Sequence, residues 1–167
     1  ACALDTFTDD MVIMYGDLLF RSYILRDLIE SDAALSVVVD SATDELDGTN
    51  AQDLAYCNEP DDRSMWGQAV SLRRIGEHAQ TTTQPRPDGR WIGMIRIKGI
   101  GRQWLLEAIK QLRQRDDFAQ LGLPELINFI LDSGHEVRVW YIHGHWINVN
   151  SWADLERAGN FTAAQDA

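Results

Sequence analysis

Apolar and polar positions follow one another along the chain in blocks that predict strands separated by helices. Continuous or alternating apolar runs, which are typical of strands in a sheet, occupy residues 11–15, 35–40, 66–75, 91–98, 136–142 and 146–150. Apolar residues spaced three or four apart, as on one face of a helix, occupy residues 20–30, 99–116, 124–133 and 151–158. Helices between strands are the signature of βαβ units and indicate an α/β fold.

The strand expected over 91–98 has two distinct faces. Successive side chains of a strand point to opposite sides of the sheet. The pattern therefore predicts one face formed by Trp91, Gly93, Ile95 and Ile97 and another formed by Ile92, Met94, Arg96 and Lys98. The last expected helix has Ser151 as its N-cap, Asp154 in its first turn and Gly159 as its end.

Residues 41–62 interrupt this pattern. The segment carries seven acidic residues and no Lys or Arg. Loops of this length are usually functional lids or disordered segments. We interpret residues 41–62 as a solvated acidic loop rather than as a second carboxylate site.

Composition narrows the classes of partner. With 167 residues, 45% of them hydrophobic, the chain is one domain or part of one. Its formal charge of -11 argues against a nucleic-acid polymer or an anionic membrane as a partner, because both need a basic face. A small phosphorylated substrate is compatible with this charge, because a metal ion can offset the local negative charge. Two cysteines are too few for a disulfide scaffold, and no signal peptide or membrane-spanning run is found, so we expect a cytoplasmic location.

Asp17 is the leading candidate for chemistry. The apolar strand over 11–15 runs into Tyr15-Gly16-Asp17, and Gly16 lets the backbone turn or approach a ligand closely. Open α/β sheets bind ligands at the carboxyl ends of their strands, where an aspartate can hold a divalent cation against a phosphate. We expect Asp17 to follow a central strand; the alternative is an aspartate in an ordinary strand-end turn.

Four segments, read together, stand in the order and spacing of a nucleotidyltransferase domain: Tyr15–Phe20, Val37–Ser41, His143–Asn150 and Ala153–Glu156. The chain most closely resembles the cytidylyltransferase domains that are fused to phosphoenolpyruvate mutase in phosphonate biosynthesis. The resemblance extends to the CTP:phosphocholine cytidylyltransferase-like and sugar-phosphate nucleotidyltransferase groups. It implies a Rossmann-like, GT-A-like α/β fold with a mixed twisted sheet.

The resemblance covers nearly all of the chain but only about the C-terminal two-thirds of the family domain. Residues 1–167 are therefore expected to be the C-terminal portion of a single domain. The family's Gly-rich loop, whose N–H groups, Arg and Lys cradle the triphosphate, has no counterpart; Gly99–Arg102 opens a helix instead. We expect the isolated chain to be inactive. We also expect an uncovered sheet edge to lead to a homo-oligomer or to contact with a fused or associated mutase domain.

The resemblance also implies a metal site. In the family the aspartate matching Asp17 binds Mg²⁺, and an acidic pair in a W-x-[DE]-x-D pattern completes the site. Here that pattern reads Trp146-Ile147-Asn148-Val149-Asn150, with both asparagines on one face of the strand. An amide oxygen can ligate Mg²⁺ without adding charge, so a weaker site is expected, shared by Asp17, Asn150 and Asn148. The other interpretation is a strand end followed by an Asx turn.

Tyr15, Gly16, His145 and Lys98 are the candidate substrate-binding residues. His143 and His145 flank a glycine and could act as an acid–base pair. Nucleotidyl transfer needs positioning and charge more than a proton shuttle, so structural histidines are the alternative. Arg63, Arg96 and Lys98 could meet a phosphonate, although solvated strand-edge cations are the preferred interpretation.

The implied reaction is attack of a phosphonate or phosphate oxygen on the α-phosphorus of CTP, with release of pyrophosphate. Mg²⁺ held by Asp17 would neutralise charge and align the reactants. The expected acceptor is 2-hydroxyethylphosphonate or 2-aminoethylphosphonate. Two alternatives remain: a non-catalytic, degenerate module that supports a mutase or an oligomer, and a GT-A-like glycosyltransferase, whose usual D-x-D triad is not supplied by Tyr15-Gly16-Asp17.

Overall fold

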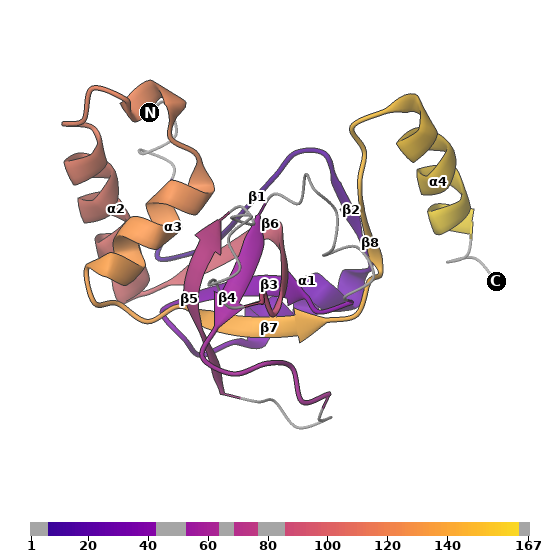
Figure 1. Cartoon of the computed structure of the whole chain (residues 1–167), viewed down its shortest axis with the longest axis horizontal. Coiled ribbons are helices and arrows are strands. Elements are labelled where there is room, and N and C mark those ends of the chain that lie inside the picture. Colours follow the sequence, from indigo (N-terminus) through magenta and orange to yellow (C-terminus); the bar gives the residue numbers. More distant parts are fainter. Residues whose placement is uncertain (1–6, 43–52, 64–68, 77–85, 164–167) are drawn as a thin grey trace.

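A six-stranded sheet with helices on both faces forms the body of the protein (Figure 1). The computed structural model describes residues 7–42, 53–63, 69–76 and 86–163. The elements, in chain order, are β1 (Asp10–Met14), β2 (Leu18–Phe20), α1 (Ser22–Glu30), β3 (Leu35–Asp40), β4 (Leu54–Cys57), β5 (Val70–Gly76), β6 (Gly89–Lys98), α2 (Ile100–Leu112), η3 (Phe118–Gln120), α3 (Leu123–Asp132), β7 (Arg138–Ile142), β8 (Trp146–Asn148) and α4 (Trp152–Ala163).

The direction of the strands decides which residues share an edge of the sheet. The strand order is β1-β6-β3-β7-β5-β4, and β4 also pairs with the start of β6. Strands β3 and β7 are parallel, whereas β6 is antiparallel to both β1 and β3. The carboxyl ends of β1, β3 and β7 therefore meet at one edge, and β6 ends at the opposite edge. Within the described strands β1 lies at the end of the order, so the expectation that Asp17 follows a central strand was wrong.

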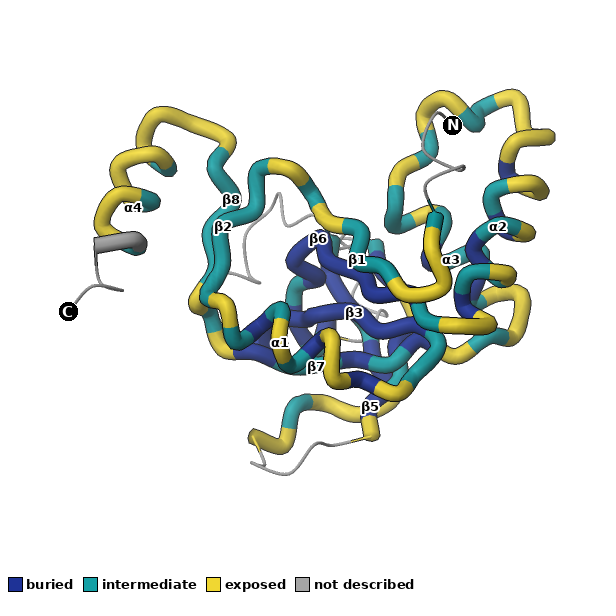
Figure 2. The backbone as a smooth tube through the Cα atoms, turned by 180° about the vertical axis from the view of Figure 1, so that it is seen from behind, coloured by how far each residue is buried: buried dark blue, intermediate teal, exposed yellow. Residues whose placement is uncertain are grey.

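Two apolar clusters lie on the two faces of the sheet, as the alternation along 91–98 predicts. Trp91, Ile95 and Ile97 belong to the cluster that packs under α2 and α3. Ile92 and Met94 belong to the other cluster, with residues of α1. Figure 2 shows β6 and β3 as buried strands at the centre, with the exposed surfaces of the helices outside them.

The ends of two helices test the expected capping signals. Gly122 N–H donates to Glu125 Oε2 at 2.7 Å at the start of α3, and Gly134 follows its end with φ +85, as expected for a helix stop.

Ser151 Oγ accepts from Asp154 N–H at 3.2 Å and so caps α4 as predicted. The predicted end at Gly159 was wrong, because α4 continues to Ala163. A glycine inside a helix costs only about 1 kcal/mol, and the last turn is held by Arg21, whose guanidinium lies 4.3 Å from the centre of the Phe161 ring.

The interpretation of residues 41–62 as one solvated loop was wrong in its second half. Strand β4 lies within this range, and Leu54 and Ala55 are fully buried. Asp88 fixes the strand from the side, because its Oδ2 accepts from Cys57 N–H at 2.7 Å. Residues 1–6, 43–52, 64–68 and 77–85 lie outside the described part, together with the expectations made for them.

Arg96 is buried rather than solvated, against the preferred interpretation. Its side chain is 3% exposed and pairs in two places with the carboxylate of Asp10, at 3.0 and 2.8 Å. It also donates to the carbonyl oxygen of Ser31. Because these partners come from β1 and from the end of α1, Arg96 ties both elements to β6.

Among the described helices, none is both long and apolar enough to cross a lipid bilayer.

Candidate functional site

A short antiparallel ribbon formed by β2 and β8 brings the two candidate metal-binding segments together (Figure 1). Leu18 lies opposite Asn148, and Phe20 lies opposite Trp146. Val149 N–H donates to the carbonyl oxygen of Asp17 at 2.9 Å, which extends the ladder by one pair. Segments that are far apart in sequence are therefore side by side at the carboxyl edge of β1.

The ladder does not point all the candidate ligands to the same side. Residues that are paired across an antiparallel ladder share a face, and their neighbours face the other way. The side chain of Asp17 therefore lies on the same face of the ladder as that of Val149. The side chain of Asn148 lies on the opposite face, together with that of Leu18. A cavity of about 440 Å³ is lined by Asn148 and Asn150, and Asp17 is not among its described lining residues.

Oxygen atoms available for a hard cation are present at this edge. The carboxylate of Asp17 is half-buried and makes no hydrogen bond or ion pair with the described residues. Asn148 Oδ1 is buried and accepts no hydrogen bond there. In the described part of the chain, no group of three or more His, Cys, Asp or Glu side chains could hold a metal ion. A cation here would depend on one carboxylate, amide oxygens and ligands from substrate or water.

Asp40 fixes the turn that leads into β8. It ends β3, is 9% exposed and carries a carboxylate that accepts three hydrogen bonds. The donors are Ala42 N–H at 3.0 Å, Gly144 N–H at 2.9 Å and the Trp146 indole N–H at 2.7 Å. Asp40 belongs to the segment Val37–Ser41 that carries the resemblance, but it was not among the candidate site residues predicted from the sequence. The available signal was a carboxylate placed directly after the apolar run of a buried strand.

Arg90 was not identified from the sequence at all. It lies opposite Asp40 in the β3–β6 ladder, and its guanidinium lies 5.4 Å from the centre of the Trp146 ring. Its Nε atom is buried and has no hydrogen-bond partner among the described residues. Burial raises the pKa of Asp53, and the charge of Arg90 opposes that rise. Arg90 therefore brings a positive charge into the wall of the cavity.

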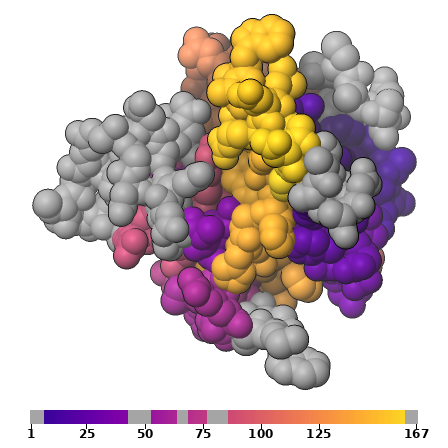
Figure 3. Space-filling model, turned by 90° about the vertical axis from the view of Figure 1, so that its right-hand side faces the viewer, coloured from indigo at the N-terminus to yellow at the C-terminus, as the bar shows by residue number. Residues whose placement is uncertain are grey.

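The opposite wall of the cavity comes from α4. Arg157 and Asp154 line it, with Arg157 Nη1 3.5 Å from Asp154 Oδ1. Asp154 Oδ2 also accepts from Ser151 Oγ at 2.7 Å, and this bond lowers the pKa of Asp154. Figure 3 looks onto this side of the molecule, with the yellow α4 above the orange segment of β7 and β8.

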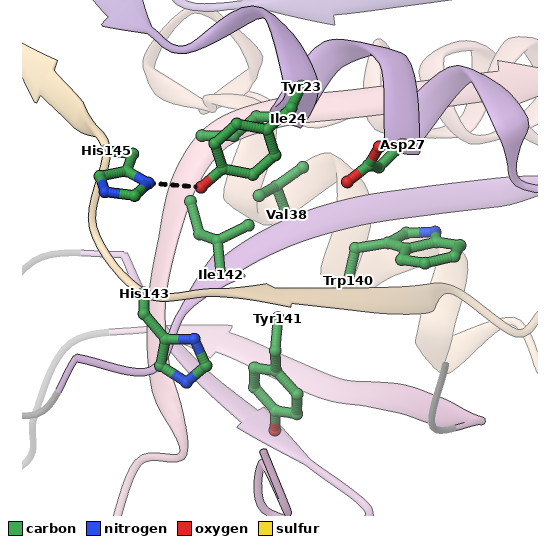
Figure 4. A pocket seen from close by; sticks show the side chains of 9 residues that line it. All are labelled: Tyr23, Ile24, Asp27, Val38, Trp140, Tyr141, Ile142, His143 and His145. Carbon is green, nitrogen blue, oxygen red and sulfur yellow. Dashed lines mark hydrogen bonds between the residues drawn. The ribbon is translucent and has the colours of Figure 1, made fainter. Parts of the chain in front are cut away.

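A second, smaller pocket of about 220 Å³ lies beside β7 (Figure 4). His145 Nδ1 and Tyr23 Oη are 2.9 Å apart in it. Burial raises the pKa of Tyr23, and the nearby carboxylates of Asp27 and Asp40 raise it further, so the phenol keeps its proton. His145 has φ +66, a conformation rare for a non-glycine residue.

His143 is directed to a different partner. Its Nε2 lies 2.8 Å from Asp61 Oδ2, which also accepts from Ser41 Oγ at 2.5 Å. Burial acts to raise the pKa of Asp61, but the hydrogen bonds from Ser41 and Arg63 and the neighbouring His143 prevail and lower it. In Figure 4 the imidazole of His143 lies on the other side of β7 from Tyr23 and His145. The two histidines thus hold separate structural contacts and are not directed at one point.

The remaining candidates lie apart from the cavity. The Tyr15 ring packs edge-on against Trp91, with 5.4 Å between ring centres, and burial raises the pKa of its phenol to about 12. Gly16 is exposed, with open space around its Cα. Lys98 ends β6 at the opposite edge of the sheet, where its Nζ lies 3.1 Å from Asp32 Oδ1. The structure therefore does not bring Lys98 to Asp17.

Solved structures of nucleotidyltransferases share this fold. An inositol-1-phosphate CTP transferase from T. maritima matches 94% of this chain with a TM-score of 0.63 and 16% identity. A UTP-bound UGPase from Acinetobacter baumannii matches 94% with a TM-score of 0.65 and 15% identity. A protein assigned as a glucose-1-phosphate thymidylyltransferase from Bacillus anthracis matches 95% with a TM-score of 0.62 and 16% identity.

The expected nucleotidyltransferase-type α/β fold with a mixed sheet is thus confirmed. This chain covers 56%, 52% and 57% of those three chains, in the same order, so it spans about half of their length. No protein-family model matches the sequence, and no curated protein matches it.

Proposed function

We propose that the chain takes part in nucleotidyl transfer, moving CMP from CTP to a small phosphonate such as 2-hydroxyethylphosphonate or 2-aminoethylphosphonate, with release of pyrophosphate. The observation that carries the proposal is the β2–β8 ribbon, which brings Asp17 beside the segment Asn148–Asn150 in a fold shared with nucleotidyltransferases. One of those structures is a CTP transferase and another is UTP-bound. Association with a mutase domain and self-association remain predictions from the resemblance.

The oxygen atoms at this edge fit Mg²⁺, which favours carboxylate and carbonyl ligands. Asp17 would supply the charged ligand, and the unpaired Asn148 Oδ1 shows that an amide acceptor is available nearby. Asn150 lies two residues beyond the end of β8 and lines the cavity with Asn148. We propose it as the second ligand from the resemblance, which requires its side chain to turn toward Asp17. When bound, the ion would neutralise phosphate charge. Asp40, through Gly144 and Trp146, holds the turn from which both asparagines follow.

We expect Asp17→Asn to weaken Mn²⁺ or Mg²⁺ binding about tenfold, because it removes the one charged ligand. Electron paramagnetic resonance titration of Mn²⁺ into the 167-residue chain measures this without any assay of activity. Asp132→Asn is the matched control, since Asp132 is exposed on α3. Equal affinity of wild type and Asp17→Asn would show that the metal does not use Asp17.

The function itself is tested by release of pyrophosphate from CTP in the presence of Mg²⁺ and either phosphonate. We expect residues 1–167 alone to be inactive, because their sequence contains no Gly-rich triphosphate loop. In a natural protein that contains this chain together with such a loop, we expect transfer, and Asp17→Asn should strongly impair it. Turnover by the 167-residue chain would contradict the expectation that transfer needs this loop. Transfer of a sugar from a nucleotide sugar would favour the glycosyltransferase alternative, and absence of any transfer by the loop-containing protein would favour a non-catalytic module.

A further inference from the structure

We propose that the 440 Å³ cavity between β8 and α4 binds the oxyanion group of a phosphonate or phosphate ester, with Arg90 as its principal anchor. The proposal deepens the proposed function, because it assigns this cavity to the acceptor. Within the described chain the cavity is formed by the end of β3, the start of β6, β8 and the first turns of α4.

Arg90 is an unsatisfied donor in the cavity wall. A guanidinium carries five N–H donors in a planar fork that matches two oxygens of a phosphate or phosphonate. No described residue forms a hydrogen bond or an ion pair with the Arg90 side chain, and its Nε is buried. Arg90 as a whole is half-buried, but leaving its buried Nε donor unpaired is unfavourable, so an anion that entered the cavity would supply the acceptor that the described residues do not.

The carboxylates in the same wall do not neutralise Arg90. Asp40 faces it across the ladder, but its oxygens are occupied by three donors from Ala42, Gly144 and Trp146. Asp154 accepts from Ser151 and Asn150 and lies near Arg157. Trp146 holds the guanidinium from one side through its ring face. The charge of Arg90 acts to lower the pKa of Asp53, but no hydrogen bond or ion pair joins these two side chains. Arg90 is therefore held in position without a direct carboxylate partner among the described residues.

Other groups of the cavity complement a tetrahedral oxyanion. Asn148 lines the cavity, and its amide NH₂ group can donate to a ligand. Arg157 lies at the rim with a 63% exposed side chain and offers a second cation. The cavity size falls within the range of about 300–1,000 Å³ of small-molecule sites. Asn148 is paired with Leu18, so this cavity lies on the other face of the β2–β8 ladder from the carboxylate of Asp17.

The test is isothermal titration of the 167-residue chain with 2-aminoethylphosphonate, methylphosphonate, inorganic phosphate and sulfate, without nucleotide or metal. We expect Arg90→Gln to weaken phosphonate binding about tenfold or more, and Arg90→Lys to recover only part of it, because lysine lacks the planar fork. Arg113→Gln is the matched control, since Arg113 is exposed at the end of α2 and does not line the cavity. Thermal melting checks that each variant is folded.

Arg157→Gln is a second test in case Arg90→Gln does not fold, because Arg157 is exposed and its replacement should not affect folding. We expect it to lower the affinity for the phosphonate about threefold, because it removes one cation at the rim of the cavity. No phosphonate binding, or equal binding by wild type, Arg90→Gln and Arg157→Gln, would overturn the proposal. Tighter binding of inorganic phosphate or sulfate than of 2-aminoethylphosphonate would overturn the assignment to an organic acceptor.

The outcome can be separated from that of the proposed function. If phosphonate binding depends on Arg90 but the protein performs no nucleotidyl transfer, the proposed anion site is supported and the proposed function is overturned. Nucleotidyl transfer by an active protein that carries Arg90→Gln, with an unchanged KM for the phosphonate, would support the proposed function and overturn the anion site.

Discussion

Gly93→Ala is expected to destabilise the protein more than any other single-methyl change proposed here. Gly93 has φ +85 and lies in β6 where the register with β3 shifts, so an alanine would adopt a strained backbone costing about 1–3 kcal/mol. Its Cβ would also lie 2.1 Å from Tyr15 Cδ2, an overlap that adds about 1–3 kcal/mol when a packed core has to shift. We expect the free energy of unfolding to fall by about 4 kcal/mol and the melting temperature by roughly 10 °C.

Denaturant unfolding followed by circular dichroism measures this change, and Gly159→Ala is its control. A Cβ at Gly159 would meet no atom within 4 Å, and the residue lies inside α4. Alanine there should stabilise the helix by up to about 1 kcal/mol. If Gly93→Ala were as stable as the wild type, Tyr15 would not be held against β6 in the way described.

Asp40→Ala is expected to lower the free energy of unfolding by about 3 kcal/mol, because it leaves three donors of partly buried hydrogen bonds without an acceptor. The donors are two backbone N–H groups, of Ala42 and Gly144, and the indole of Trp146. Asp40→Asn keeps one acceptor oxygen and should lose about half as much. The change should also release the Trp146 indole, seen as a shifted and faster-exchanging N–H resonance.

Asp132→Ala is the control for this prediction, because Asp132 is exposed near the end of α3. Its effect should stay within about 0.5 kcal/mol. Similar stabilities of Asp40→Ala and Asp132→Ala, with an unchanged Trp146 resonance, would show that other contacts hold the turn before β8.

Periodicity predicted the parts of the fold that are long and covered by helices. The continuous run Val37–Val39 is buried because both faces of β3 are covered, and the two faces of β6 separate as their alternation requires. Strand β4 was missed because four apolar residues stand in an acidic stretch whose composition resembles a loop. Strand β2 has three residues, too few to show a period, and its pairing with β8 makes it a strand. Strand β8 lies within the run predicted over 146–150 but ends at Asn148.

The site was only partly predictable, because its geometry depends on register. The resemblance indicated correctly that the segments around Asp17 and Asn150 come together, but the sides on which Asp17 and Asn148 lie follow from the β2–β8 ladder. Arg90 gave no signal of its own, since its partner Trp146 is distant in the sequence. The expectation that Arg96 is solvated followed the usual exposure of arginine, but its side chain is buried and its carboxylate partner, the exposed Asp10, comes from another strand.

The strand order β1-β6-β3-β7 has a consequence for how the chain is made. During synthesis from the N-terminus, β3 leaves the ribosome well before β6 and β7, the two strands that flank it. Closing such long loops costs entropy before any pairing compensates for it, and folds of this kind form slowly. The run Val37–Val39 therefore stays without a neighbour on either edge until residues 89–98 have emerged, and it is an exposed apolar strand in the nascent chain, where such segments tend to aggregate.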